Sequence, residues 1–325
     1  MISKKSTRRE FLGTSAGLAT MGLAIGCSTA PEMEDTETEG REREGTEATM
    51  KLSLSVRVAE AFGSKEESTL TIDQLIELAK NNGYEALCMR ASQAGIHSPP
   101  ETIREMSREV KEAGLVASMV TGDFAVPRND EHGPDGLRNI TPYLDLAEEF
   151  GADLIRICMK KDEDIEWAKK ASDEARERKI RLVHQAHCAS LFETVEGSLR
   201  VLKEVGRPNF GIIYEPANWM IAGQDYGEET IQNLEPYIFN VYVQNHRLNP
   251  NGAASVNTWA RGRVRLDHIG LWEEGGVDFE EVFAGLHVIN YRGFVTVHQA
   301  FAGVMPIEEA VRKSSEYLKP LTKGI

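Results

Sequence analysis

The chain has 325 residues, of which 27% are charged, and its formal net charge at pH 7 is −14. This length accommodates one (β/α)8 barrel of roughly 250 residues together with a leader. The excess of acidic residues argues against nucleic-acid binding, because such a protein needs a basic surface to meet the phosphates.

The first 27 residues are typical of an export signal. Arg8 and Arg9 precede a mildly apolar stretch over residues 12–25, and this pattern resembles a twin-arginine signal peptide. The stretch is shorter than the roughly 20 residues that cross a bilayer. The tetrapeptide Ala-Ile-Gly-Cys that ends at Cys27 resembles a lipoprotein cleavage box. We therefore expect export to the periplasm or cell surface, with a lipid anchor at Cys27 as the contact with a membrane.

Residues 28–50 are expected to form an acidic, disordered linker. Within them, residues 31–50 contain eight acidic residues and two arginines, a net charge of −6. The segment has no aromatic side chain, and a composition of this kind does not bury enough apolar surface to fold.

From residue 51 to residue 325, short β-rich runs alternate with amphipathic helical patterns. The predicted strands cover residues 52–58, 86–90, 115–120, 154–159, 181–185, 210–215, 239–244 and 294–298. The predicted helices cover residues 72–82, 100–113, 140–150, 163–178, 193–205, 229–237, 279–288 and 307–318. Eight alternating pairs predict an α/β fold, a single-domain (β/α)8 TIM barrel. An open doubly wound sheet would usually carry a glycine-rich fingerprint after an early strand, which this sequence lacks.

Glycines and cysteines agree with this reading. Five glycines stand at the ends of predicted helices, where a left-handed residue commonly ends a helix: Gly83, Gly114, Gly151, Gly206 and Gly293. Three cysteines follow Cys27, namely Cys88, Cys158 and Cys188. An odd number without paired spacing favours free thiols.

Polar side chains gather where the predicted strands end, which is where a barrel places its active site. The earlier strands contribute Arg90 and Arg156, which can bind a phosphate, a carboxylate or a sugar hydroxyl, or else form an internal ion pair. The last four strands contribute Gln185, His187, Glu215, Gln244, His246, Arg247 and His298.

These strand ends resemble those of the xylose-isomerase-like barrel superfamily of sugar isomerases and epimerases, which includes inosose dehydratases. The resemblance covers about residues 51–320. Members typically bind one divalent metal through Glu, Asp, His and Glu at the last four strands. The corresponding positions here are Gln185, Glu215, Tyr242 and His298, while a local likeness to the dehydratases points to Glu193 in place of Gln185.

The resemblance implies one divalent metal ion, although this set has fewer carboxylates and more nitrogen ligands than usual. We expect an ion of the Zn, Mn or Co type among Gln185, Glu215, His246 and His298. The alternatives are a hydrogen bond between Gln185 and Gln244, a core role for His298 and a solvated loop position for His246.

The expected activity is that of a sugar or keto-polyol isomerase or epimerase that acts through an enediolate, which needs a base at carbon and a donor at oxygen. The resemblance assigns catalysis to Glu193, Glu215 and His298. Substrate binding is assigned to Arg90, Arg156, His187, Gln244 and Arg247. The alternatives are a carbohydrate lyase and a non-catalytic carbohydrate-binding barrel with a degenerate metal site.

A long segment over residues 248–276 follows the seventh predicted strand. A connection of this length is often a lid or a binding loop. Its Trp259 and Trp272 can stack on a sugar face or pack the loop itself.

Overall fold

The computed structural model describes residues 49–61 and 63–323. The predicted leader, the lipidation site at Cys27 and most of the predicted linker lie outside these residues. Met50, the last residue assigned to the linker, is 2% exposed and donates a backbone hydrogen bond to Thr322. The folded barrel therefore includes Met50.

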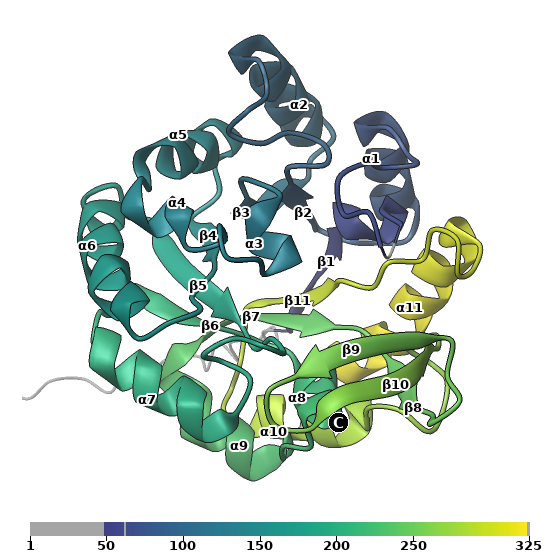
Figure 1. Cartoon of the computed structure of the whole chain (residues 1–325). Coiled ribbons are helices and arrows are strands. Elements are labelled where there is room, and N and C mark those ends of the chain that lie inside the picture. The colour runs from purple at the N-terminus through teal and green to yellow at the C-terminus, as the bar shows by residue number, and fades with distance from the viewer. Residues whose placement is uncertain (1–48, 62, 324–325) are drawn as a thin grey trace, which may run out of the picture. The chain divides into compact units, whose positions relative to one another are not determined.

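Eight parallel strands close into a barrel in the order β1-β11-β7-β6-β5-β4-β3-β2 (Figure 1). They are β1 (Lys51–Ser55), β2 (Ala86–Arg90), β3 (Val116–Thr121), β4 (Leu154–Ile157), β5 (Arg181–Gln185), β6 (Phe210–Tyr214), β7 (Ile238–Val243) and β11 (Phe294–Val297). This architecture confirms the predicted TIM barrel.

Eight helices cover the outside of the barrel (Figure 1). They are α1 (Ile72–Asn81), α2 (Pro100–Glu112), α5 (Thr141–Phe150), α6 (Glu163–Glu177), α7 (Val195–Val205), α9 (Glu228–Leu234), α10 (Phe279–Val288) and α11 (Ile307–Thr322). Over the described residues, no helix combines the length and apolar character needed to cross a membrane.

Several short elements were not predicted, because one or two turns carry no clear periodicity. These are the 3-10 helix η1 (Val56–Ala59) and the α-helices α3 (Ala125–Arg128), α4 (Asp135–Arg138) and α8 (Pro216–Ala222). The 3-10 helix η2 (Glu235–Tyr237) is the last turn of the helix predicted over residues 229–237. The element η1 replaces the end of the first predicted strand. Its presence turns the chain at Val56, directly after the strand reaches the barrel mouth.

Four of the five glycines that were predicted to end helices have the expected left-handed conformation. Gly83, Gly114, Gly151 and Gly206 have φ values between 56° and 78°. Gly293 does not have a positive φ, so its predicted role is wrong. Asn290, two residues after the end of α10, has a φ of 53° instead, since asparagine tolerates the left-handed region better than most residues.

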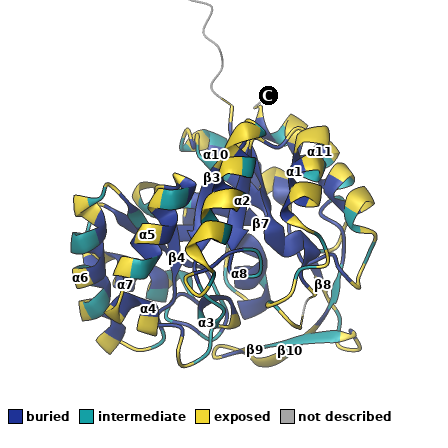
Figure 2. Cartoon of the chain, turned by 90° about the horizontal axis from the view of Figure 1, so that it is seen from above, coloured by how far each residue is buried: buried dark blue, intermediate teal, exposed yellow. Residues whose placement is uncertain are grey.

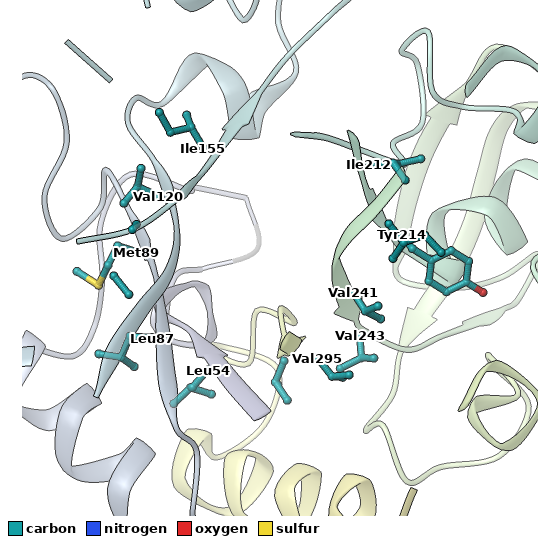
Figure 3. Close-up of a cluster of buried hydrophobic side chains, with 14 of the residues drawn as sticks. Leu54, Leu87, Met89, Val120, Ile155, Ile212, Tyr214, Val241, Val243 and Val295 are labelled. Atoms are coloured by element: carbon teal, nitrogen blue, oxygen red, sulfur yellow. The ribbon is translucent and has the colours of Figure 1, made fainter. Parts of the chain in front are cut away.

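The barrel has two concentric layers of buried side chains, because side chains alternate along each strand. The outer layer packs against the helices and includes Leu54, Leu87 and Val120 (Figure 3). The inner layer fills the barrel with Cys88, Met119, Leu154, Val183, Ile213 and Tyr242. The cysteines at 88, 158 and 188 are free and buried, as predicted.

The segment predicted as a long loop contains a small antiparallel sheet. Its strands β8 (His246–Leu248), β9 (Ala254–Thr258) and β10 (Gly262–His268) pair in the order β8-β10-β9. Figure 2 shows β9 and β10 at the opposite end of the barrel from the C-terminus. Leu266 of β10 joins Cys188 and Ile221 in a separate apolar cluster, which attaches the sheet to loops at the barrel mouth.

Candidate active site

A polar layer lies directly above the inner apolar layer of the barrel. Its members follow inward-facing apolar residues by two positions, so they point to the same side of their strands. They are Arg90, Arg156, Gln185, Glu215 and Gln244, which follow Cys88, Leu154, Val183, Ile213 and Tyr242. All five are at most 6% exposed. The strand pattern therefore concentrates polar groups at one end of the barrel interior.

Glu215 is at the centre of this layer and is 0% exposed. Its Oε2 accepts hydrogen bonds from Gln185 Nε2 and, at 2.9 Å, from Asn218 Nδ2, while Oε1 accepts one from Gln244 Nε2. Burial raises the pKa of Glu215 to about 7, although Gln185 and the nearby Arg156 lower it in part. Because both glutamines bind Glu215, the alternative that they bind each other is wrong.

His298 is buried beside this network. Its Nδ1 lies 3.1 Å from Ser55 Oγ, and its ring stacks on Tyr242 with the centroids 3.7 Å apart. Burial, followed by the charges of Arg57 and Arg90, holds its pKa well below the usual value. His298 is therefore a neutral imidazole at neutral pH, with one nitrogen oriented by a serine.

A cavity of about 100 Å³ opens above the polar layer. The residues that line it are Arg57, Lys65, Pro127, Arg156, Gln185, His187, Asn218, Ile221, Gln244, His246, Val256 and His298. Six of the predicted site residues are thus brought to one cavity. Glu215 lies behind the wall that Gln185, Asn218 and Gln244 form.

Arg57 and Lys65 are cavity residues that the sequence analysis missed. Arg57 follows the inward-facing Ser55 by two positions, a signal that was available, but it lies in η1 rather than in the predicted strand. Lys65 is on the loop after η1, where its Nζ donates to the carbonyl oxygen of Pro127 at 3.0 Å. Loops of this kind carry no periodicity from which a position in the fold can be inferred.

The remaining histidines have distinct partners. Nδ1 of His246 lies 3.0 Å from Nδ1 of His268, and His246 is 3% exposed, so the alternative of a solvated loop position is wrong. Burial lowers the pKa of His246 well below the usual value. His187 is partly exposed, and its Nδ1 lies 2.8 Å from the carbonyl oxygen of Cys188.

Besides Glu215, three predicted site residues do not line the cavity, namely Arg90, Glu193 and Arg247. Arg90 forms an ion pair at 2.8 Å with the buried Glu60, which bears out the internal ion-pair alternative for this residue. Arg247 is exposed and donates to the carbonyl oxygen of Glu274 at 2.7 Å. The predicted substrate-binding role of Arg247 therefore has no support from its position, because its guanidinium faces the small sheet's own loop.

Glu193 does not line the cavity and makes structural contacts, so its position does not support the predicted catalytic role. Its carboxylate accepts backbone N–H bonds from Ala189 at 2.5 Å, Trp259 at 2.8 Å and Ala260 at 2.6 Å. Trp259 and Ala260 form the tip of the β9–β10 hairpin, so Glu193 holds the hairpin against the barrel. Unlike Glu215, Glu193 contacts none of the residues that form the cavity wall through these bonds.

The arrangement does not fit a resident divalent metal ion. The described part of the chain contains no group of three or more His, Cys, Asp or Glu side chains that could hold one. Of the predicted ligands, Glu215 has amide donors on both oxygens. Arg57 and Arg156 add positive charge beside the same residues, and such charge opposes a dication.

These observations define the class of protein: a (β/α)8 barrel with a polar cavity at the carboxyl ends of its strands, where barrel enzymes have their active sites. The family model described as xylose isomerase-like TIM barrel matches residues 76–321. The chain therefore belongs to this family, as the strand-end residues suggested.

Solved structures of low sequence identity share the fold. A probable 3-DHS dehydratase from Bacillus anthracis is 18% identical, with a TM-score of 0.62 over 83% of this chain and 99% of that one. D-allulose 3-epimerase from Methylomonas sp. is 15% identical, with a TM-score of 0.60 over 84% and 98%.

A family member from Mycobacterium smegmatis, solved in complex with magnesium, is 16% identical, with a TM-score of 0.61 over 85% of this chain and 97% of that one. No curated protein sequence matches the chain. At these identities the likeness extends to the fold, and the activity has to be argued from the residues of this chain.

Proposed function

We propose that the protein is an isomerase or epimerase that transfers a proton at a carbon next to the carbonyl group of a small sugar or polyol. The observation that supports this most strongly is Glu215, a buried carboxylate whose pKa of about 7 is that of an effective base at neutral pH. The carboxylate of Glu215 lies directly behind the cavity wall and accepts hydrogen bonds from three residues of that wall.

Two glutamines supply acceptors for the hydroxyl groups of such a substrate. Each donates its amide N–H to Glu215, which turns the amide oxygen away from the carboxylate. The Oε1 atom of Gln185 is buried without a hydrogen-bond partner in the described structure. A buried acceptor without a donor is costly, and a sugar hydroxyl at the cavity wall would satisfy it.

In the proposed step, the substrate displaces one amide from Glu215, and the freed carboxylate oxygen takes the proton from carbon. The electrons of the C–H bond form the C=C bond of an enediolate, and the carbonyl electrons move to oxygen. Neutral His298 donates a hydrogen bond to that oxygen, in the manner of a neutral imidazole electrophile. Return of the proton to the former carbonyl carbon, together with transfer of the hydroxyl proton from one enediolate oxygen to the other, gives an isomer. Return of the proton to the opposite face of the original carbon gives an epimer.

A divalent ion is not part of this proposal. The family includes a structure solved with magnesium, but the donor set of this cavity has one carboxylate, which three amides already occupy. The hydrogen bond that stabilises the substrate oxygen comes from neutral His298 instead. The activity of the purified full chain should therefore survive treatment with a chelator.

Incubation of the full chain with a panel of aldoses, ketoses and polyol ketones tests this proposal. We expect a product of unchanged mass and altered configuration, detected by chromatography with mass spectrometry. A product lighter by one water would identify a lyase instead. Saturable sugar binding without any product would identify a carbohydrate-binding barrel, and either result would overturn the isomerase assignment.

A further inference from the structure

Two arginines line the cavity with unsatisfied nitrogen atoms. Arg57 is 8% exposed and Arg156 is 3% exposed, and both line the wall. Among residues 49–61 and 63–323, the Nε atoms of both have no hydrogen-bond partner. Leaving a buried cationic donor unpaired costs free energy that a folded protein ordinarily avoids. The cavity is therefore prepared for a group with negative charge.

The protein's own carboxylates do not supply that charge. Glu60 pairs with Arg90, and Glu215 accepts from three amides. In the part of the chain that the structure describes, no carboxylate is within the 4.0 Å ion-pair distance of Arg57 or Arg156. The two guanidinium groups thus share one cavity without a carboxylate in ion-pair contact, and Glu215 acts on both only over a longer distance.

We propose that the cavity binds a sugar acid, and that Arg57 and Arg156 hold its carboxylate group. This inference rests on the proposed function, since it names the class of that enzyme's substrate. A guanidinium presents paired N–H donors that match a carboxylate. A compact monoanion suits a cavity of about 100 Å³, and the adjacent Glu215 repels a dianion such as a phosphate ester more strongly.

The sugar part of the ligand also has partners in this cavity. The glutamines at 185 and 244 offer amide oxygens for hydroxyl groups, while Ile221 and Val256 offer apolar contact. Such a ligand would lie between the cationic wall and Glu215, with its carbonyl carbon toward the proposed base.

Lys65, which also lines the cavity, provides a second way to measure anion binding. Burial lowers its pKa to about 7, and Arg57, Arg90 and Arg156 lower it further against the opposing effect of Glu60. A bound anion favours the protonated amine and raises this pKa. Binding of a sugar acid slightly above pH 7 should therefore be accompanied by proton uptake.

Calorimetry on the full chain with matched ligand pairs tests the inference: D-glucuronate against D-glucose, and D-gluconate against D-glucitol. We expect each acid to bind at least about 10-fold more tightly than its neutral partner. Arg57→Gln and Arg156→Gln should remove this preference and leave the affinity for the neutral partner unchanged. Arg312→Gln, which removes an exposed arginine of α11 that pairs with Glu316, is the charge-matched control.

Proton uptake is measured by repeating the titration at pH 7.5 in two buffers of different ionisation enthalpy. The wild type should take up protons on binding either acid, and Lys65→Met should not. Thermal unfolding confirms that each variant is folded. Arg57→Lys keeps the positive charge but lacks the paired N–H donors of a guanidinium, so it should retain part of the preference for the acid over its neutral partner.

Equal affinity for the acid and its neutral partner, tighter binding of inorganic phosphate than of either acid, or absence of acid binding at millimolar concentration would overturn the inference. The outcome is separate from that of the proposed function. Sugar acids that bind, with no aldose, ketose or polyol ketone of the panel converted, would leave the carboxylate site in place and refute the isomerase. Neutral sugars that are converted without any acid preference would do the reverse.

Discussion

At the scale of single residues, the site consists of one buried carboxylate, a neutral histidine and uncompensated cations. Arg156 carries a charge that burial disfavours, since burial is the first cause that lowers its pKa. Groups that serve a ligand rather than the fold commonly reduce stability. This gives a test that separates the binding role of Arg156 from a structural one.

Arg156→Met removes the charge and keeps a flexible apolar side chain of similar length. We expect the free energy of unfolding at pH 7 to rise by about 1–2 kcal/mol, because a desolvated, unpaired cation is lost. Urea denaturation measures the change, with Arg312→Met as the exposed control. A loss of stability would mean that Arg156 supports the barrel.

The pH dependence of the rate follows from Glu215. Its pKa in the folded protein is raised from 4.5 to about 7, so the base form is present above pH 7 and is lost as the pH falls. We expect kcat/KM to decrease about tenfold per pH unit below pH 7. In Arg156→Met the midpoint should move to higher pH, because Arg156 lowers the pKa of Glu215. A midpoint that stays near pH 4.5 in both proteins would argue against Glu215 as the base.

At the scale of elements, strand periodicity predicted most of the barrel. Runs such as residues 86–90 and 181–185 were placed within the bounds of β2 and β5. Their positions at the ends of predicted strands then indicated one site for Gln185, Glu215 and Gln244, and the structure brings these three side chains together. Local pattern is sufficient for these features because each strand is buried on both faces.

The parts that could not be predicted depend on contacts between distant residues. The small sheet β8-β10-β9 escaped detection because Arg263 and Arg265 are exposed and no apolar run marks its strands. Glu193 was assigned to catalysis because its backbone partners, at Trp259 and Ala260, lie far along the chain. The spacing of residues in the sequence does not predict contacts between residues so far apart in the chain.

The β9–β10 hairpin should depend on Glu193 for its position. Glu193→Gln replaces an oxygen that accepts backbone N–H bonds with an amide donor, at a cost of about 1–3 kcal/mol. We expect faster hydrogen exchange at the amides of residues 259 and 260, with the barrel strands unchanged. Glu196→Gln, an exposed substitution on α7, is the control. Unchanged exchange at the hairpin tip would show that other contacts hold it.

At the scale of the whole molecule, buried neutral histidines set the response to acid. Burial lowers the pKa of His184 to about 3 and those of His246 and His298 well below 6.5. In the unfolded chain these groups bind protons below about pH 6.5, while in the folded protein they do not, so stability falls as the pH decreases. Each contributes at most about 1.4 kcal/mol per pH unit.

Thermal unfolding from pH 8 to pH 5 checks this response. We expect the midpoint temperature to fall steeply below about pH 6.5 and less steeply in His298→Gln, which keeps a polar side chain and removes one proton-binding site. His132→Gln, an exposed histidine, should behave like the wild type. A midpoint temperature that is constant down to pH 5 would contradict the neutral state of the buried histidines.

The location of the molecule follows from the leader, which is proposed to direct export. Replacing Arg8 and Arg9 together by lysine should retain the protein in the cytoplasm, because the twin-arginine route reads this pair. Cell fractionation followed by immunoblotting measures the distribution. Replacement of Cys27 by alanine should leave export intact and release the exported protein from the membrane fraction. Export that persists without the arginine pair would refute the assignment.

The proton transfer at Glu215 is the central claim, and isotope exchange tests it most directly. The full chain, treated with chelator, is incubated in D2O with a substrate identified from the panel, and NMR follows deuterium at the carbon next to the carbonyl. We expect exchange in the wild type and in Glu204→Gln, an exposed control on α7, and a loss of at least about 100-fold in Glu215→Gln. Exchange that continues undiminished in Glu215→Gln would contradict the claim.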